Sequence, residues 1–399
     1  MATRIGRSVL SSDNPSATAT FKKPSLQQQK VGPRPLGNTN KNISTLKPIQ
    51  PLAQNGTHSK QLSRSNSLAK RDASAKPLAK ENRQHGADSI LSISKLSVKE
   101  PDTADTKQTE PQSYSTAMLP AEVTDIDALD SGNVQLCSQY AKEIYNYLSE
   151  LELQYPVRPN FLANKREITA SMRSILVNWL VQVHAKFNLL QETLYLTIAV
   201  LDRYLQAEAV SRSKLQLVGM TAMFIAAKYE EMYSPDIGDY IYISDNAYSK
   251  TDILKMEITM LKALDFCLGR PLPLHFLRRA SKAGNVTVTV HTMAKYLLEL
   301  SITDYSMAHI RPSLLAATSL WLSLQMLDDG DWTTDLAYYG RYTKKEMESV
   351  ASKMCRLVMT ASSGSRNVIY NKYKSPKFES ISNRPELHSE LVRELAAKP

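Results

Sequence analysis

The sequence predicts an all-α protein in which two tandem helical repeats follow an N-terminal helix and a long disordered tail. The first observation is Lys214–Glu231, which is too long for a strand and is apolar or small on nearly every side. The second is Pro312–Gln325, where the same pattern recurs about 97 residues later. The third is residues 1–100, which hold a single aromatic residue and many Ser, Asn, Gln and Pro. A period of this length suits two compact bundles of roughly 100 residues each.

The N-terminal tail, residues 1–130, is predicted to be a disordered, basic regulatory segment. Its first 100 residues carry 17 Lys and Arg against 5 Asp and Glu, and such a composition cannot bury a core. Of the chain's 49 basic and 39 acidic residues, 32 and 34 fall in 101–399, so the net charge of +10 belongs to the tail. A basic tail can touch nucleic acid or acidic surfaces, but a solvated charge run is the favoured interpretation.

Two short motifs stand in this tail. One matches the KEN degron, a signal read by the ubiquitin ligase that destroys mitotic regulators: Lys80, Glu81 and Asn82. The other is spaced like a leucine-rich nuclear export signal, whose apolar side chains enter a receptor groove: Ile90, Ile93, Leu96 and Val98. A chance apolar cluster explains the second motif equally well. With a working export signal, the protein would shuttle between cytoplasm and nucleus.

The composition also excludes several classes of protein. Cys137, Cys267 and Cys355 are far apart and form no CxxC, so neither a disulfide framework nor a zinc site is indicated. The sequence has no signal-peptide core and no uncharged apolar run of membrane-spanning length, which predicts an intracellular protein without a membrane partner. No hydrolase, nucleotide-binding or metalloprotease motif is present. We therefore expect no enzymatic activity, no cofactor and no metal.

The N-terminal helix is predicted within 133–160. Its apolar residues lie on one helical stripe: Leu136, Tyr140, Ile144, Tyr147, Leu148 and Leu151. Pro156 and Pro159 interrupt the chain after it. Such a helix lies either on its own domain or on a partner.

The first repeat is predicted over 161–268. Met172–Phe187 and Gln191–Tyr204 have apolar residues at helical spacing and precede the central helix from Lys214. Ser249 has the position of an N-cap, and Asp252 stands three residues on, at the positive end of the last helix.

The second repeat and a C-terminal extension are predicted over 269–399, after a linker at Gly269–Pro273. The helical segments are expected near 274–284, 288–304, 311–327, 333–340 and 343–361. From about residue 365 the chain is expected to pack back on the repeat.

Four charged residues stand in apolar helical settings: Arg173, Asp202, Lys228 and Glu257. Periodicity alone favours ordinary salt bridges between helices over contacts with a partner. Gln325 occupies the place of Lys228 in the second repeat, so any role of Lys228 is confined to the first.

Longer motifs, found in the right order, resemble those of the B-type mitotic cyclins: MRSILVNWL at 172–180, LQETLY at 190–195, AKYEEMY at 227–233 and GRPLPLHFLRRASK at 269–282. The resemblance runs from about residue 133 to the C-terminus. It implies two five-helix cyclin boxes and a non-catalytic subunit that binds and activates a mitotic cyclin-dependent kinase. It also implies substrate docking and ubiquitin-dependent destruction at mitotic exit.

The resemblance implies roles for individual residues. Arg173 and Asp202 would brace the first box. The implied kinase-binding residues are Lys228, Glu257, Phe266, Leu268, Ile144 and Tyr147. The implied patch for substrates bearing Arg-x-Leu is formed by Met172, Ile175, Leu176, Trp179 and Gln216. Asn178 departs from the family, which usually has Asp before the Trp, and so removes a negative charge beside the patch.

A basic pocket for phosphate on partners is implied at Arg278, His291 and Lys295. His291 and Lys295 are four residues apart and share a helix face, so a nearby Arg would complete a phosphate site. A solvated basic face is the equally supported alternative.

Two other classes of protein compete with the kinase activator. General transcription factors also use paired folds of this kind, but the balanced charge of 101–399 gives no basic face for nucleic acid. A helical adaptor without a kinase partner is excluded only by the motifs.

Overall fold

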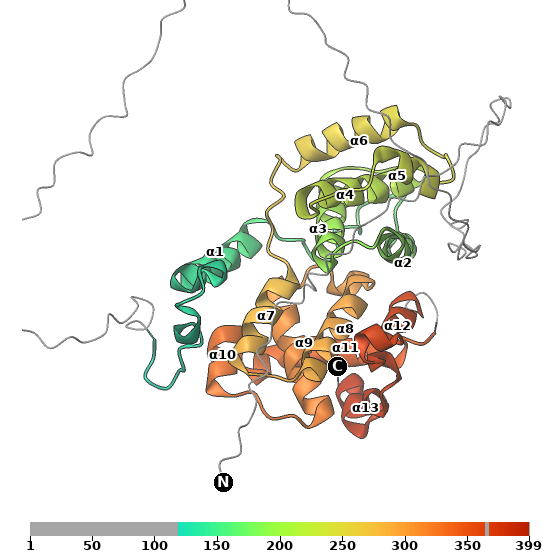
Figure 1. Cartoon of the computed structure of the whole chain (residues 1–399). Coiled ribbons are helices and arrows are strands. Elements are labelled where there is room, and N and C mark those ends of the chain that lie inside the picture. The colour runs from blue at the N-terminus through green and yellow to red at the C-terminus, as the bar shows by residue number, and fades with distance from the viewer. Residues whose placement is uncertain (1–118, 364–366, 399) are drawn as a thin grey trace, which may run out of the picture. The chain divides into compact units, whose positions relative to one another are not determined.

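The computed structural model describes residues 119–363 and 367–398, and it confirms the predicted all-α class, because every regular element in these ranges is helical (Figure 1). The first repeat holds α2 (Ala170–Phe187), α3 (Gln191–Ala207), α4 (Leu215–Glu230), α5 (Ile237–Ile243) and α6 (Lys250–Ala263). The second holds α7 (Pro273–Ala283), α8 (Val288–Ile302), α9 (Pro312–Leu327), α10 (Thr334–Gly340) and α11 (Lys344–Met359). The helices outside the repeats are α1 (Ala141–Gln154), α12 (Asn367–Tyr373) and α13 (Glu390–Ala397).

Each repeat is organised around one helix that is buried on all sides. In α4 every residue from Leu217 to Ala227 is buried, and in α9 burial is nearly as complete. Gly219 explains how α2 approaches α4 so closely, because a Cβ atom there would lie 2.8 Å from the Leu176 side chain. A rigid, fully packed helix therefore leads directly to Lys228 at its C-terminal end.

Local sequence signals fix where several helices begin. Ser249 caps α6 as predicted, since its hydroxyl accepts from the Asp252 N–H and the Asp252 carboxylate accepts from the Ser249 N–H. Thr343 and Glu346 form the same arrangement at α11. These caps satisfy N–H groups that the first helical turn leaves without partners.

The N-terminal helix differs from its predicted bounds. Val134–Leu136 and Ser138–Tyr140 form 3-10 turns, and Cys137 between them has a left-handed backbone with φ of 49°. The regular helix therefore begins only at Ala141, although the apolar stripe starts earlier in the sequence.

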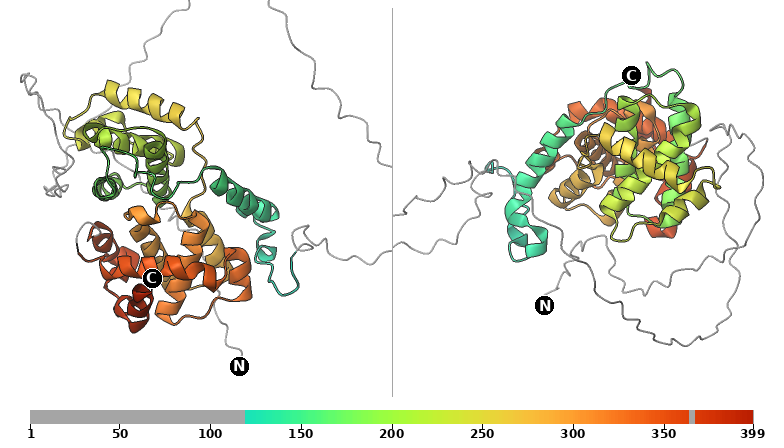
Figure 2. Two further views of the ribbon diagram at one scale, coloured as in Figure 1. Left: turned by 180° about the vertical axis from the view of Figure 1, so that it is seen from behind. Right: turned by 90° about the horizontal axis from the view of Figure 1, so that it is seen from above.

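The C-terminal extension packs back on the repeats, as predicted. Helix α13 lies against α11, and α12 contacts α2 and α8 (Figure 2). Buried Glu299 of α8 accepts hydrogen bonds from Lys372 and Tyr373 of α12 and from Gln191 of α3. The extension thus fastens the second repeat to the first.

Three findings concern the absences predicted from the sequence. All three cysteines are free thiols. Within 119–363 and 367–398, no cluster of His, Cys, Asp and Glu is placed to hold a metal ion. In the same ranges, no helix combines the length and apolarity needed to cross a bilayer.

Candidate functional site

The C-terminal end of α4 carries the first candidate site. Ala227 is fully buried, whereas the side chain of Lys228 is 45% exposed. Lys228 Nζ lies 2.6 Å from Glu257 Oε1 on α6 and 4.0 Å from the centre of the Phe224 ring. The ammonium donor of Lys228 and the carboxylate acceptor of Glu257 therefore lie side by side on two packed helices. A partner protein can form a hydrogen bond with either group in place of the ion pair.

Exposed apolar side chains lie on α4 and α6 and on the segments that follow these two helices. Phe266 is 65% exposed, and Met232 and Tyr233 are each 87% exposed. Leu254, one turn before Glu257 on α6, and Ile258, one turn after Leu254, are also exposed. We call this set the α4–α6 surface: Tyr229, Met232, Tyr233, Leu254, Ile258 and Phe266 with Lys228 and Glu257. Apolar groups clustered around a few charges are typical of a protein-binding surface.

Only part of this surface was predicted from the sequence. Phe266 and Leu268 were among the predicted residues, but Leu268 is half-buried and packs against the core. The exposed apolar residues after the charged end of α4, and Leu254 and Ile258 on α6, were not predicted. The signal was present at Met232 and Tyr233, where apolar residues continue after the helix has left the core.

Helix α1 offers a second exposed face. Ile144 and Tyr147 are exposed, whereas Tyr145 and Glu152 attach α1 to the second repeat. The Tyr145 hydroxyl donates to the His275 carbonyl, and buried Glu152 accepts from both the N–H and the hydroxyl of Ser313. Helix α1 is therefore anchored along one side and presents apolar residues on the other.

Arg173 and Asp202 form a buried ion pair where the repeats meet. Nε and Nη2 of Arg173 each lie 2.6 Å from one oxygen of Asp202, in the bidentate geometry that suits a guanidinium. Nη1 of Arg173 donates to the Ile302 carbonyl at 3.1 Å. The pair thus joins α2 and α3 of the first repeat to α8 of the second.

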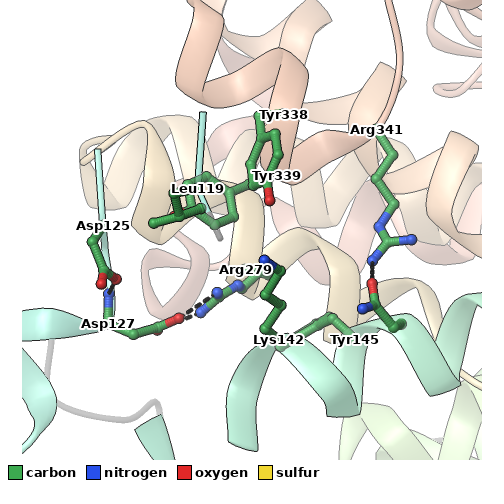
Figure 3. Close-up of a pocket in the computed structure, with 10 residues that line it drawn as sticks. Leu119, Asp125, Asp127, Lys142, Tyr145, Arg279, Tyr338, Tyr339 and Arg341 are labelled. Carbon is green, nitrogen blue, oxygen red and sulfur yellow. Dashed lines mark hydrogen bonds and ion pairs between the residues drawn. The ribbon is translucent and has the colours of Figure 1, made fainter. Parts of the chain in front are cut away.

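Residues 119–130 form a strap on the second repeat, although the sequence analysis placed them in the disordered tail. Asp127 receives two hydrogen bonds of 2.5 Å from Arg279 of α7, whose guanidinium also lies over the Tyr145 and Tyr339 rings (Figure 3). Asp335 accepts a hydrogen bond from the Thr124 N–H at 2.8 Å.

A cavity of about 290 Å³ lies between the strap, α1, α7 and α10. Burying Asp127 requires a partner 152 residues away, which local sequence patterns do not reveal.

The strap should make stability depend on acid pH. Burial opposes ionisation of Asp127, but the hydrogen bonds and charges of Arg279 and Lys282 outweigh it and lower the pKa of Asp127 below its ordinary value of 3.8. Its ionised form therefore stabilises the fold above that ordinary pKa, and this contribution is lost as pH falls through the lowered pKa. We expect Asp127→Asn to lower the melting temperature at pH 7 and to differ progressively less from the wild type below about pH 4.

Glu150 is exposed, and Glu150→Gln serves as the control for this measurement. This variant should melt at the same temperature as the wild type both at pH 7 and below pH 4. A constant difference between wild type and Asp127→Asn at all pH values would contradict the pairing.

The N-terminal domain model of the cyclins matches residues 143–269, and the C-terminal domain model matches 271–387. A G2/mitotic-specific cyclin-B of Patella vulgata is 50% identical over 294 residues, which cover 74% of this chain and 71% of that protein. The protein of the same name from Spisula solidissima is 51% identical, over 73% of this chain and 68% of its own. A G2/mitotic-specific cyclin-B2 of Bos taurus is 52% identical, over 72% of each chain.

The chain belongs to the B-type cyclins. The two helical repeats are its cyclin boxes, as the motifs predicted. It is a regulatory protein of the cell cycle that belongs to the G2 and mitotic phases.

The members of the predicted docking patch lie at different depths in this B-type cyclin. Leu176 is completely buried beneath Gly219, and Trp179 is only 5% exposed. Both side chains belong to the core, because α2 turns this face toward α4. Ile175 is exposed, and Met172 and Gln216 are half-buried, so these three are the members that a ligand can reach.

The predicted phosphate pocket is only partly available. Arg278 Nη2 is paired with Glu192 of the first box at 2.5 Å, so phosphate would have to displace a carboxylate. His291 Nδ1 lies 2.8 Å from the Ser281 hydroxyl, and Ser281 is one turn after Arg278 on α7. Lys295 lies one turn after His291 on α8 and is half-buried. The three basic residues therefore come from adjacent turns of neighbouring helices.

The two motifs of the tail lie outside the described residues. These are the degron at Lys80, Glu81 and Asn82, and the export-like segment Ile90–Val98.

Proposed function

We propose that this B-type cyclin is a non-catalytic regulatory subunit that binds and activates a mitotic cyclin-dependent kinase through the α4–α6 surface. One observation carries the proposal: a Lys–Glu pair joins the end of a rigid buried helix to α6, and exposed apolar side chains lie on these two helices and directly after them. Exposed aromatic and methionine side chains supply the desolvated centre of a protein interface.

The charges would recognise main chain rather than a particular side chain. An ammonium group donates hydrogen bonds to carbonyl oxygens, and a carboxylate accepts them from N–H groups. Because the ion pair already restrains both side chains, a partner would bind them with a smaller loss of side-chain entropy. A kinase element that binds this surface in only one of its conformations would be shifted toward that conformation, which is activation by population shift.

Co-purification tests the proposal directly. The full chain should form a stable complex with a monomeric cyclin-dependent kinase, and the complex should phosphorylate a simple peptide much faster than the kinase alone. Absence of both effects would remove the proposed function.

Substrate docking is the second part of the proposal, and the exposed Ile175 tests it better than the buried Trp179. Ile175→Ser should preserve the kinase complex and its activity on simple peptides, but it should reduce the preference for substrates bearing Arg-x-Leu. Trp179→Ala should instead lower the free energy of unfolding by about 3–5 kcal/mol, because it empties a core position. Steady-state kinetics with matched peptides and urea unfolding separate the two effects.

Val288→Ser is the matched control, since Val288 is an exposed aliphatic residue on the second box. Loss of peptide preference in this control as well would show that the effect is not specific to the patch.

The tail supplies the third part of the proposal: destruction by the ubiquitin ligase of mitotic exit and shuttling between nucleus and cytoplasm through an export receptor. A degron must be extended and accessible, and a polar segment without a core meets both needs. Deletion of residues 1–100 should preserve kinase activation and prolong the protein's lifetime after mitosis. Ala at positions 80, 81 and 82 in the full chain should reproduce the longer lifetime.

Time courses of protein abundance in synchronised cells measure this effect. If the truncated chain disappears on the same schedule as the full chain, the destruction signal lies elsewhere.

A further inference from the structure

Arg270 is a buried cation without a protein partner. It lies in the linker between the two cyclin boxes and is 9% exposed. Among the described residues, none accepts a hydrogen bond or forms an ion pair with its guanidinium, and its Nε is fully enclosed. Burial lowers the pKa of Arg270 to about 10, so the group is still charged at neutral pH. A buried charge without a partner is strongly unfavourable.

The neighbouring charges do not compensate it. Asp202 raises the pKa of Arg270 from a distance, but both of its oxygens already accept from Arg173. Glu152 acts in the same direction and is bound to Ser313. Arg203 adds a further positive charge and donates to the Cys267 carbonyl. The three arginines therefore exceed the two carboxylates by one positive charge.

A crevice of about 60 Å³ lies beside this surplus charge. Its walls come from three parts of the chain: Arg173, Tyr195 and Asp202 of the first box, Arg270 of the linker, and Ile302, Ala308 and Leu315 of the second box. The walls from the second box are apolar except for Ser301, whose hydroxyl donates to the Leu298 carbonyl, so this box supplies no carboxylate to Arg270. A water molecule needs about 10–15 Å³ of such space, so the crevice has room for only a few particles of that size.

We propose that this crevice is a binding site for a small monovalent anion, of which chloride is the simplest, and that the anion bridges the two cyclin boxes through Arg270. One negative charge balances the local excess and supplies the acceptor that the guanidinium lacks. The volume excludes a nucleotide, a phosphopeptide or a protein side chain attached to its backbone. The site differs from the α4–α6 surface and from the basic residues of α7 and α8.

Anion binding would stabilise the chain as a whole. A ligand that binds the folded state and not the unfolded state raises the melting temperature as its concentration rises. The crevice disappears if the boxes separate, so the bound anion also favours their packed arrangement.

The ³⁵Cl NMR line width of sodium chloride, measured with the full chain in solution, tests the site. We expect excess broadening with the wild type and its loss with Arg270→Met, while the exposed Arg166→Met retains it as a charge-matched control. Ala308→Leu fills the crevice, keeps Arg270 and should also remove the broadening. If Arg270→Met does not fold, the Ala308→Leu variant alone tests whether the broadening comes from the crevice.

Thermal melting gives a second readout. When chloride replaces gluconate at constant ionic strength, the melting temperature of the wild type and of Arg166→Met should rise, but that of Arg270→Met should not. No excess broadening with the wild type, as expected if water alone fills the crevice, would overturn the proposal. The proposal would also be overturned if Arg270→Met and Ala308→Leu kept the broadening seen with the wild type, because the anion would then bind elsewhere.

Discussion

Kinase binding should fall by well over tenfold when Lys228 and Glu257 are both replaced by Ala, while the protein stays folded. The Lys228 side chain is 45% exposed and that of Glu257 13%, so solvent reaches the ammonium group and loss of the pair costs the isolated chain about 1 kcal/mol. In a complex the same groups would be desolvated and hydrogen-bonded, and losing such contacts costs about 2–5 kcal/mol. Calorimetric titration of kinase with each variant measures the affinity, and a phosphorylation assay measures activation.

A second ion pair provides a matched control. Lys344 Nζ lies 2.6 Å from Asp331 Oδ1, and the two lysine side chains match in exposure at 46% and 45%, although Asp331 is 65% exposed and Glu257 13%. Replacing both residues by Ala removes the same charges from the second box and should leave kinase affinity unchanged. Wild-type activation by a stably folded Lys228/Glu257 double variant would remove the central claim.

Arg173→Met should strongly lower the free energy of unfolding. Arg173 is completely buried, and its removal leaves the Asp202 carboxylate and the Ile302 carbonyl without their donor. Breaking a buried pair in this way costs about 3–5 kcal/mol, because one charge is left uncompensated. Urea unfolding of the full chain, followed by circular dichroism, gives the shift in midpoint.

The double variant Arg173→Met with Asp202→Leu separates the cost of leaving the Asp202 carboxylate unpaired from the cost of losing the Arg173 side chain. If the unpaired carboxylate dominates, the apolar pair recovers part of the stability that Arg173→Met loses, since both partners are now absent. The exposed Arg166→Met should leave the midpoint unchanged. A midpoint for Arg173→Met close to the wild-type value would show that the pair does not hold the boxes together.

The sequence by itself determined the helices and their duplication. Hydrophobic periodicity is a property of neighbouring residues, and so are caps such as Ser249 with Asp252. The abrupt charge after Ala227 likewise located the end of α4 and the exposed Lys228. The motifs also identified the family, because long matches in order are specific.

Only the tertiary structure decided which face of each helix stays exposed and which distant charges meet. Leu176 and Trp179 fit a docking patch in sequence but lie in the core, and Gly219 lets α4 approach Leu176 closely. Arg278 is bound by Glu192, 86 residues away, and Arg279 fixes Asp127 in a segment whose composition predicts disorder. Local propensity carries no information about such pairs, since their energy exists only when packing has already brought the two groups together and removed them from water.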